Sequence, residues 1–131
     1  MNGPRIYVDT SALAVLLRVE PPRDALITWL DGSGAELVSG DLLETELRRI
    51  AVREGIDQAL VTRLLDGVAL ASLDRAVFRG AGLLPIVGLR SLDALHLETA
   101  LRLDVSGVLT YDHRLADAAE SVGLDVVAPG Q

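Results

Sequence analysis

The stretch Ile6–Leu13 constrains the fold more than any other part of the chain. Three strand-forming residues, Ile6–Val8, run directly into Asp9, and a Thr-Ser pair then leads into an apolar helical run. This order predicts a buried strand, a tight turn and the start of a helix. Ligands of an open parallel sheet bind outside the carboxyl ends of the strands, so we expect Asp9 at the functional edge. An Asp in this position can also serve only to cap the helix.

The composition excludes several classes of protein. A length of 131 residues fits a single domain, residues 1–131. The chain has no Cys and only two His, which argues against disulfides, thiolate sites and His-rich zinc sites. It has neither an apolar run of membrane-spanning length nor a signal-peptide pattern, so we expect a cytoplasmic protein without membrane contact. The net charge of −7 argues against binding nucleic acid through a basic surface.

Strand-like and helical segments alternate along the whole sequence. After the first strand, further strands are predicted at residues 36–39, 68–73, 107–111 and 125–128, with helical segments between them. Hairpin signals are few, so the pattern predicts a three-layer α/β/α sandwich with a mostly parallel central sheet. Asp41 and Glu44 have the spacing of a capping box and are predicted to open the helix that follows the second strand.

Four acidic residues stand where solvation alone does not explain them. Asp9 and Asp112 each follow an apolar strand and are expected to face the same crevice. Glu46 borders the buried stripe of its helix, and Asp93 lies in a first helical turn, where the dipole favours a carboxylate. Several carboxylates in one crevice repel one another and call for a compensating cation. Oxygen ligands without His or Cys favour Mg²⁺ or Mn²⁺, which also promote phosphodiester chemistry.

Around these acidic residues, four motifs occur in order along essentially the whole chain. They are Val8-Asp9-Thr10-Ser11-Ala12-Leu13, Thr45-Glu46-Leu47-x-Arg49, Leu92-Asp93-Ala94-Leu95-His96-Leu97 and Leu109-Thr110-Tyr111-Asp112-x-Arg114-Leu115. Together they resemble the motifs of PIN domains and, more narrowly, of the VapC ribonuclease toxins of bacterial type II toxin–antitoxin modules. The first motif alone is weakly specific, whereas all four in order at this length are strongly specific.

The resemblance implies a metal-dependent endoribonuclease with a PIN-like fold. RNA would be cleaved by attack of a metal-activated water on a phosphodiester. Because an acidic protein gains little from nonspecific attraction to phosphates, we expect specific structured RNA, such as transfer or ribosomal RNA, as the substrate. Mg²⁺ is the implied cofactor, which Mn²⁺ can replace, and a homodimer and a VapB-type antitoxin are the implied partners. The catalytic and metal-binding residues would be Asp9, Glu46, Asp93 and Asp112. The alternative is a catalytically inactive PIN-fold module for RNA binding or assembly, which a metal-dependent cleavage assay would distinguish.

Hydroxyl and basic side chains surround the four carboxylates in the sequence. Thr10, Ser11 and Thr110 are expected to orient the carboxylates or bound waters. Arg114 and Arg49 are the candidates for contacting RNA.

Three further residues bear on the composition of the acidic site. Glu44 competes with Glu46 for the second motif, and we prefer Glu46 because the capping box already explains Glu44. Asp117 is expected on a solvated helix surface, and the sequence leaves open whether it joins the acidic site. His96 is expected to be packed or hydrogen-bonded rather than to bind metal.

Overall fold

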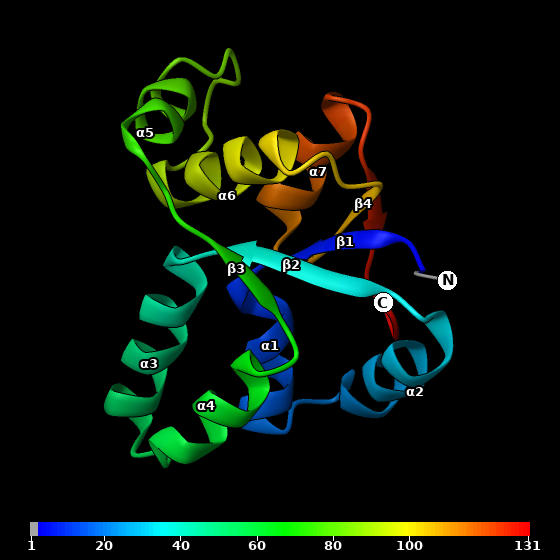
Figure 1. The fold of residues 1–131 in the computed structure, drawn as a ribbon. Coiled ribbons are helices and arrows are strands. Elements are labelled where there is room, and N and C mark those ends of the chain that lie inside the picture. Colours follow the sequence, from blue (N-terminus) through cyan, green and yellow to red (C-terminus); the bar gives the residue numbers. More distant parts are fainter. Residues whose placement is uncertain (1–2) are drawn as a thin grey trace.

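The computed structural model describes residues 3–131, and their strands form one parallel sheet (Figure 1). The strands are β1 (Arg5–Val8), β2 (Glu36–Gly40), β3 (Ala69–Ala71), β4 (Gly107–Leu109) and β5 (Asp125–Val127). They lie in the order β3-β2-β1-β4-β5, with Val8 of β1 opposite Leu109 of β4. The chain order reverses between β1 and β4. In an open parallel sheet, the crevice at the carboxyl ends of two such strands is where ligands bind.

Helices cover both faces of the sheet. They are α1 (Thr10–Arg18), α2 (Arg23–Ser33), α3 (Leu42–Glu54), α4 (Gln58–Leu65), α5 (Arg75–Gly82), α6 (Ser91–Arg102) and α7 (His113–Ser121). The first four lie on one face and the last three on the other (Figure 1). The predicted three-layer α/β/α sandwich is confirmed, and every strand pair is parallel. None of the helices within residues 3–131 combines the length and apolar character needed to cross a membrane.

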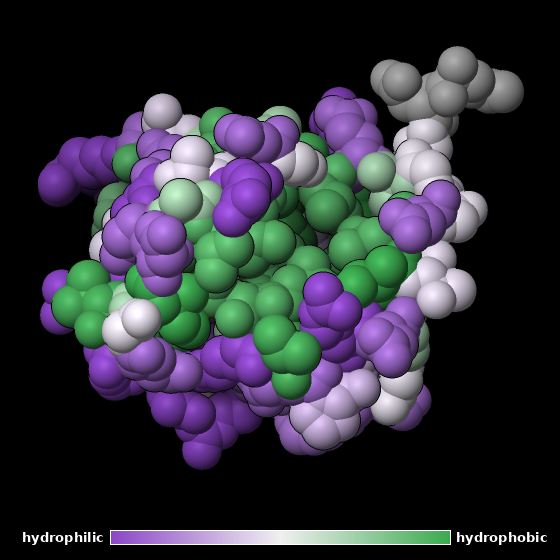
Figure 2. Space-filling model, turned by 90° about the horizontal axis from the view of Figure 1, so that it is seen from below, coloured by the Kyte–Doolittle hydropathy of each residue, from purple (hydrophilic) through white to green (hydrophobic). Residues whose placement is uncertain are grey.

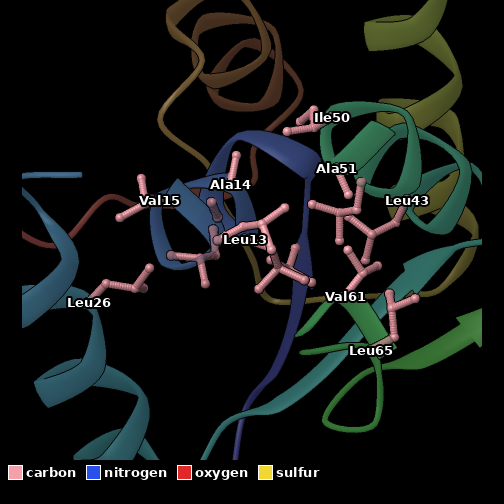
Figure 3. Close-up of a cluster of buried hydrophobic side chains, with 14 of the residues drawn as sticks. Leu13, Ala14, Val15, Leu26, Leu43, Ile50, Ala51, Val61 and Leu65 are labelled. Carbon is pink, nitrogen blue, oxygen red and sulfur yellow. The ribbon is translucent and has the colours of Figure 1, made fainter. Parts of the chain in front are cut away.

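Side chains of β1 alternate between two hydrophobic cores, as the period of a strand requires. Ile6 and Val8 pack in the larger core, which includes residues of α1, α2, α3 and α4. Figure 3 shows part of this core, where Leu13 of α1 lies between Leu26 of α2 and the side chains of α3 and α4. Tyr7 points the other way, into the core formed with α6 and α7. The carboxyl end of β1 is thereby held from both faces.

The predicted capping box at the start of α3 is wrong. Asp41 has helical backbone angles (φ −57°, ψ −21°), and its side chain makes no capping hydrogen bond within the described chain. A capping side chain normally extends from a residue with extended backbone angles, from which it reaches the first free amides of the helix. Glu44 instead pairs with Arg48 one turn later, at 2.8 Å between its Oε2 and the Arg48 Nε.

Helix α1 ends at a residue with an unfavourable backbone conformation. Val19 has φ 57° and ψ 55°, and its amide donates to the Val15 carbonyl. This left-handed region crowds the Cβ atom of any L-residue, and a β-branched residue is especially rare there. The Val19 side chain is nonetheless 70% exposed, so burial of its own surface does not compensate for the strain.

Replacing Val19 with glycine is therefore expected to stabilise the fold. Glycine adopts positive φ freely, and after its larger entropy in the unfolded chain is subtracted, the free energy of unfolding should rise by about 0.5–1 kcal/mol. Urea denaturation measures this change. Val122→Gly is the matched control, because Val122 also ends a helix but has φ −106°, and its replacement should lower stability. Destabilisation of similar size in both variants would contradict the strain argument.

Candidate active site

Asp9 is a buried carboxylate at the carboxyl end of β1, where it also caps α1. Ser11 Oγ donates to its Oδ1 at 2.8 Å, and Thr110 Oγ1 donates to its Oδ2 at 2.9 Å. The amide of Ala12 donates to Oδ1 at 3.3 Å. Both oxygens are therefore held in place, one from the turn after β1 and the other from the segment after β4.

Burial changes the acidity of Asp9. Loss of contact with water raises the pKa of this carboxyl to about 6, while His96 and the hydrogen bonds from Ser11 and Thr110 act in the opposite direction. Burial, rather than repulsion from the other carboxylates, is therefore the main cause of the shift.

Thr110 connects the ends of β1 and β4. Besides donating to Asp9, its Oγ1 accepts from the amide of Asp112 at 3.0 Å and lies 3.2 Å from Ser11 Oγ. Ser11 Oγ in turn accepts from the amide of Tyr111 at 2.9 Å. The Asp112 carboxylate then caps α7 by accepting from the amide of Arg114 at 2.9 Å. Two hydroxyl groups thus fix the relative positions of Asp9 and Asp112.

Three of the four predicted carboxylates line one pocket. Glu46 of α3, Asp93 of α6 and Asp112 border a volume of about 310 Å³, together with Arg90, Ser91 and Leu92. Asp9 is buried and does not line this pocket, although Thr110 bonds to both Asp9 and Asp112. The structure therefore brings the four residues of the motifs to one edge of the sheet, with Asp9 below the surface.

Asp112 is close enough to Asp93 to affect the acidity of the Asp93 carboxyl. Burial raises the pKa of Asp93, and the neighbouring Asp112 carboxylate raises it further, while Arg90 acts against this shift. Two carboxyl groups in contact cannot both ionise easily without a compensating positive charge.

The Glu46 carboxylate is held by hydrogen bonds through one of its two oxygens. Its Oε1 accepts from Thr10 Oγ1 at 2.6 Å and lies 2.6 Å from His96 Nε2. Burial by itself would raise the pKa of Glu46, but the hydrogen bonds from His96 and Thr10 outweigh it and hold the pKa below its usual value. Glu46 is therefore an ionised carboxylate at neutral pH.

The chemistry of this pocket suits a hard divalent cation. Within residues 3–131, no three Asp, Glu, His or Cys side chains are grouped closely enough to form a ready metal site. Three carboxylates nonetheless line the pocket, and Mg²⁺ prefers such oxygen ligands. The Asp112 carboxylate also repels that of Asp93. Asp93, Asp112, Glu46 and the nearby Asp9 are the residues that would hold the ion.

The other residues singled out in the sequence do not line the acidic pocket. Arg114 and Asp117 line a neighbouring pocket of about 270 Å³, Arg49 is exposed on α3, and Glu44 pairs with Arg48. Sequence reasoning missed Arg90, the basic side chain that lines the acidic pocket. Its place three residues before Asp93, at the start of α6, was the available signal.

Replacing Asp9 with asparagine is expected to stabilise the metal-free protein at neutral pH. The carboxyl has a pKa of about 6 in the folded state against 3.8 unfolded, so its contribution to stability is full below pH 3.8 and is lost as the pH rises through 6. In EDTA at pH 7, Asp9→Asn should raise the free energy of unfolding by about 1–3 kcal/mol, since each pKa unit is worth about 1.4 kcal/mol. At pH 4 the gain should nearly vanish.

Urea denaturation of both proteins at the two pH values measures this difference. Asp31→Asn is the control, because Asp31 is exposed and its replacement should change stability by less than about 0.5 kcal/mol at either pH. A gain for Asp9→Asn that is equal at pH 4 and pH 7 would contradict burial of the charge as its cause.

Comparison with known proteins identifies the family. Residues 6–121 match the family model described as the PIN domain. The chain is 40% identical over 133 residues to Ribonuclease VapC35 of Mycobacterium tuberculosis, and the match covers 96% of this chain and 98% of the relative. It is 37% identical over 132 residues to Ribonuclease VapC47 of the same organism, covering 95% of this chain and 97% of the relative.

A solved structure agrees with this assignment at the level of the fold. The crystal structure of Mycobacterium tuberculosis VapC20, described as a Sarcin-Ricin loop cleaving toxin, superposes with a TM-score of 0.74. The match covers 95% of this chain and 99% of that chain at 15% identity. With its parallel sheet and the full-length similarity to VapC ribonucleases, the chain belongs to the PIN domain family.

Proposed function

We propose that this protein is a Mg²⁺-dependent endoribonuclease that acts in the cytoplasm as the toxin of a type II toxin–antitoxin module. The observation that carries this proposal is the pocket in which Glu46, Asp93 and Asp112 meet, beside the buried Asp9. Relatives named as VapC ribonucleases, similar over nearly the whole chain, support the same activity.

The side chains of the pocket have separate tasks in this proposal. Asp93 and Asp112, with Asp9 and Glu46, hold Mg²⁺, for which Mn²⁺ can substitute. When bound, the ion supplies neutralisation of phosphate charge and a lower pKa for attacking water. Glu46 is ionised and fixed through one oxygen, so its other oxygen can orient a water or accept its proton. Arg90, at the edge of the pocket, can bind a phosphate oxygen of the RNA through its guanidinium.

The proposed substrate is structured RNA, such as a stem-loop of transfer or ribosomal RNA. A protein with a net charge of −7 gains little affinity from nonspecific attraction to phosphates. Arg90 in the pocket, Arg114 in the neighbouring pocket and the exposed Arg49 offer few basic contacts. Recognition then depends on an RNA shape that presents one phosphate to the pocket.

A VapB-type antitoxin is the proposed partner, and an apolar groove is its proposed docking site. The groove, with a volume of about 420 Å³, lies between α1, α2 and α4 and is lined by Leu16, Leu17, Val19, Arg23, Ile27, Leu60, Arg63 and Leu64. Figure 2 views this side of the molecule and shows apolar side chains gathered at its centre. An amphipathic segment could lay its apolar face into such a groove. Arg23 and Arg63 also line the groove, and their guanidinium groups could pair with acidic side chains of the partner.

The same antitoxin segment can also reach the acidic pocket. Helix α1 begins next to Asp9 and ends at the groove, and its nine residues span roughly 14 Å. A basic side chain from the antitoxin would be attracted to the carboxylates there, and an Arg could pair with two carboxylate oxygens at once. The antitoxin would then compensate the negative charge without supplying a metal ion's Lewis acidity.

We also propose a homodimer. Apolar side chains are exposed on α5, α6 and the loop between them, and exposed apolar surface is a common feature of interaction sites. They are Phe78, Leu83, Val87 and Leu92. A second copy of the chain would cover them.

The catalytic part of the proposal is tested by RNA cleavage with a pair of glutamate variants. Wild-type protein should cleave RNA with Mg²⁺ and not with excess EDTA. Glu46→Gln should lower the rate by about 100-fold or more, because it removes an ionised group from the pocket. Glu44→Gln is the matched control and should retain most activity, because Glu44 makes only a partly exposed pair with Arg48.

Cleavage that persists in EDTA would refute the metal dependence. If Glu44→Gln were the inactive variant while Glu46→Gln remained active, the assignment of the second motif would be wrong. Absence of cleavage by wild-type protein with Mg²⁺ on any structured RNA, despite RNA binding, would favour the inactive PIN-fold module.

Metal and antitoxin are expected to compete. Raising Mg²⁺ at fixed ionic strength should weaken binding of a C-terminal antitoxin fragment, because both need the same carboxylates. Leu60→Glu should weaken that binding at every Mg²⁺ concentration, because Leu60 lines the groove. Val52→Glu, an exposed apolar position on α3 outside the groove, should leave it unchanged. A fragment affinity that does not depend on Mg²⁺ would place inhibition away from the acidic pocket.

A further inference from the structure

His96 is a buried side chain that uses both of its ring nitrogens. It lies on α6, one turn after Asp93, and is 3% exposed. Its Nδ1 lies 2.7 Å from the Tyr7 hydroxyl, and its Nε2 lies 2.6 Å from Glu46 Oε1. The Tyr7 and His96 rings also meet edge to face, with their centroids 5.7 Å apart. One imidazole thus links β1 to α3.

The acceptor Glu46 fixes the direction of the two hydrogen bonds that His96 makes. A carboxylate oxygen is a hydrogen-bond acceptor, and Glu46 Oε1 also accepts from Thr10, so His96 Nε2 carries the hydrogen and donates it. In a neutral imidazole the other nitrogen, Nδ1, is then an acceptor, and the Tyr7 hydroxyl is its donor. The donors therefore run from Tyr7 to His96 to Glu46.

The hydrogen bonds to Glu46 reach only one of its two carboxylate oxygens. Oε1 receives hydrogen bonds from both His96 and Thr10, each at 2.6 Å. No hydrogen bond from residues 3–131 reaches Oε2, which leaves that oxygen available to the pocket that Glu46 lines. A free glutamate side chain loses rotamer entropy when a ligand fixes it, whereas the Glu46 side chain is already held by these hydrogen bonds before a ligand binds.

The hydrogen-bond partners of His96 differ from those usual for a buried polar side chain. Buried side-chain donors and acceptors are nearly always paired, most often with backbone. Thr99, also buried on α6, follows that rule by donating to the Leu95 carbonyl of its own helix. His96 instead pairs with two side chains from other elements, and one of these belongs to the acidic pocket.

We propose that His96 and Tyr7 are positioning residues for Glu46. Tyr7 fixes the imidazole in the form with hydrogen on Nε2, and His96 holds Oε1 so that Oε2 is presented to a divalent cation in the pocket. The inference rests on the proposed function of that pocket as a cation site. Partners that orient a ligand in this way typically change metal affinity by about 10- to 100-fold.

Binding of Mn²⁺ to the whole protein without RNA tests this role, measured from the electron paramagnetic resonance signal of free Mn²⁺. His96→Leu should weaken Mn²⁺ binding by about 10- to 100-fold. His96→Gln should recover most of the affinity, because its amide can donate to Oε1. Tyr7→Phe, which keeps the ring but removes the donor, should weaken binding to a smaller extent. Thr99→Val is the matched control, and it should lower the urea midpoint while leaving Mn²⁺ affinity unchanged.

A second readout does not depend on metal. The ¹⁵N spectrum of the His96 ring in metal-free wild-type protein should show hydrogen on Nε2 at neutral pH. Hydrogen on Nδ1 alone would overturn the proposed direction of the hydrogen bonds.

The outcomes separate this inference from the proposed function. Wild-type binding of Mn²⁺ together with unchanged affinity in His96→Leu would overturn the positioning role while leaving the cation site in place. If His96→Leu does not fold, unchanged affinity in Tyr7→Phe overturns the role in the same way. No Mn²⁺ binding by wild-type protein would refute the cation site itself, and the positioning role with it.

Discussion

The pair of hydrogen bonds that Ser11 and Thr110 donate to Asp9 is the constraint on which the site depends. A carboxylate taken out of water is strongly disfavoured unless donors satisfy its oxygens. Here one donor comes from the turn after β1 and the other from the segment after β4. The sheet reverses its order between β1 and β4, and ligands of such folds bind in the crevice at that point. The two hydrogen bonds to Asp9 therefore hold the two sides of this crevice together.

The acidic pocket lies between the two helical layers rather than within either one. Glu46 comes from α3 on one face of the sheet, and Asp93 comes from α6 on the other (Figure 1). The contact between His96 and Glu46 joins these layers beyond the carboxyl ends of the strands. The spacing of the carboxylates is therefore set by how the layers pack, and the two hydrophobic cores contribute to the chemistry by holding that packing.

The sequence predicted the elements well because apolar strands and amphipathic helices leave local signals. The capping box at Asp41 failed, since a favourable spacing does not ensure the extended backbone that a cap needs. Motif order was enough to nominate Asp9, Glu46, Asp93 and Asp112 for one site. The burial of Asp9 and the link from Tyr7 through His96 to Glu46 were not predicted, because residues up to 101 positions apart meet there. Such contacts depend on strand order and register, which local patterns do not encode.

The place of β4 beside the central strand β1 also determines when the site can form during synthesis. β4 lies beside β1 in the sheet, although Gly107 pairs with Ile6 from the start of the chain. Contacts between such distant segments cannot form before the later segment has been made. A growing chain can therefore fold α1 to α4 around β1 and β2 while Asp112 has yet to emerge. The acidic pocket would be incomplete in such an intermediate, and it would form only late in translation.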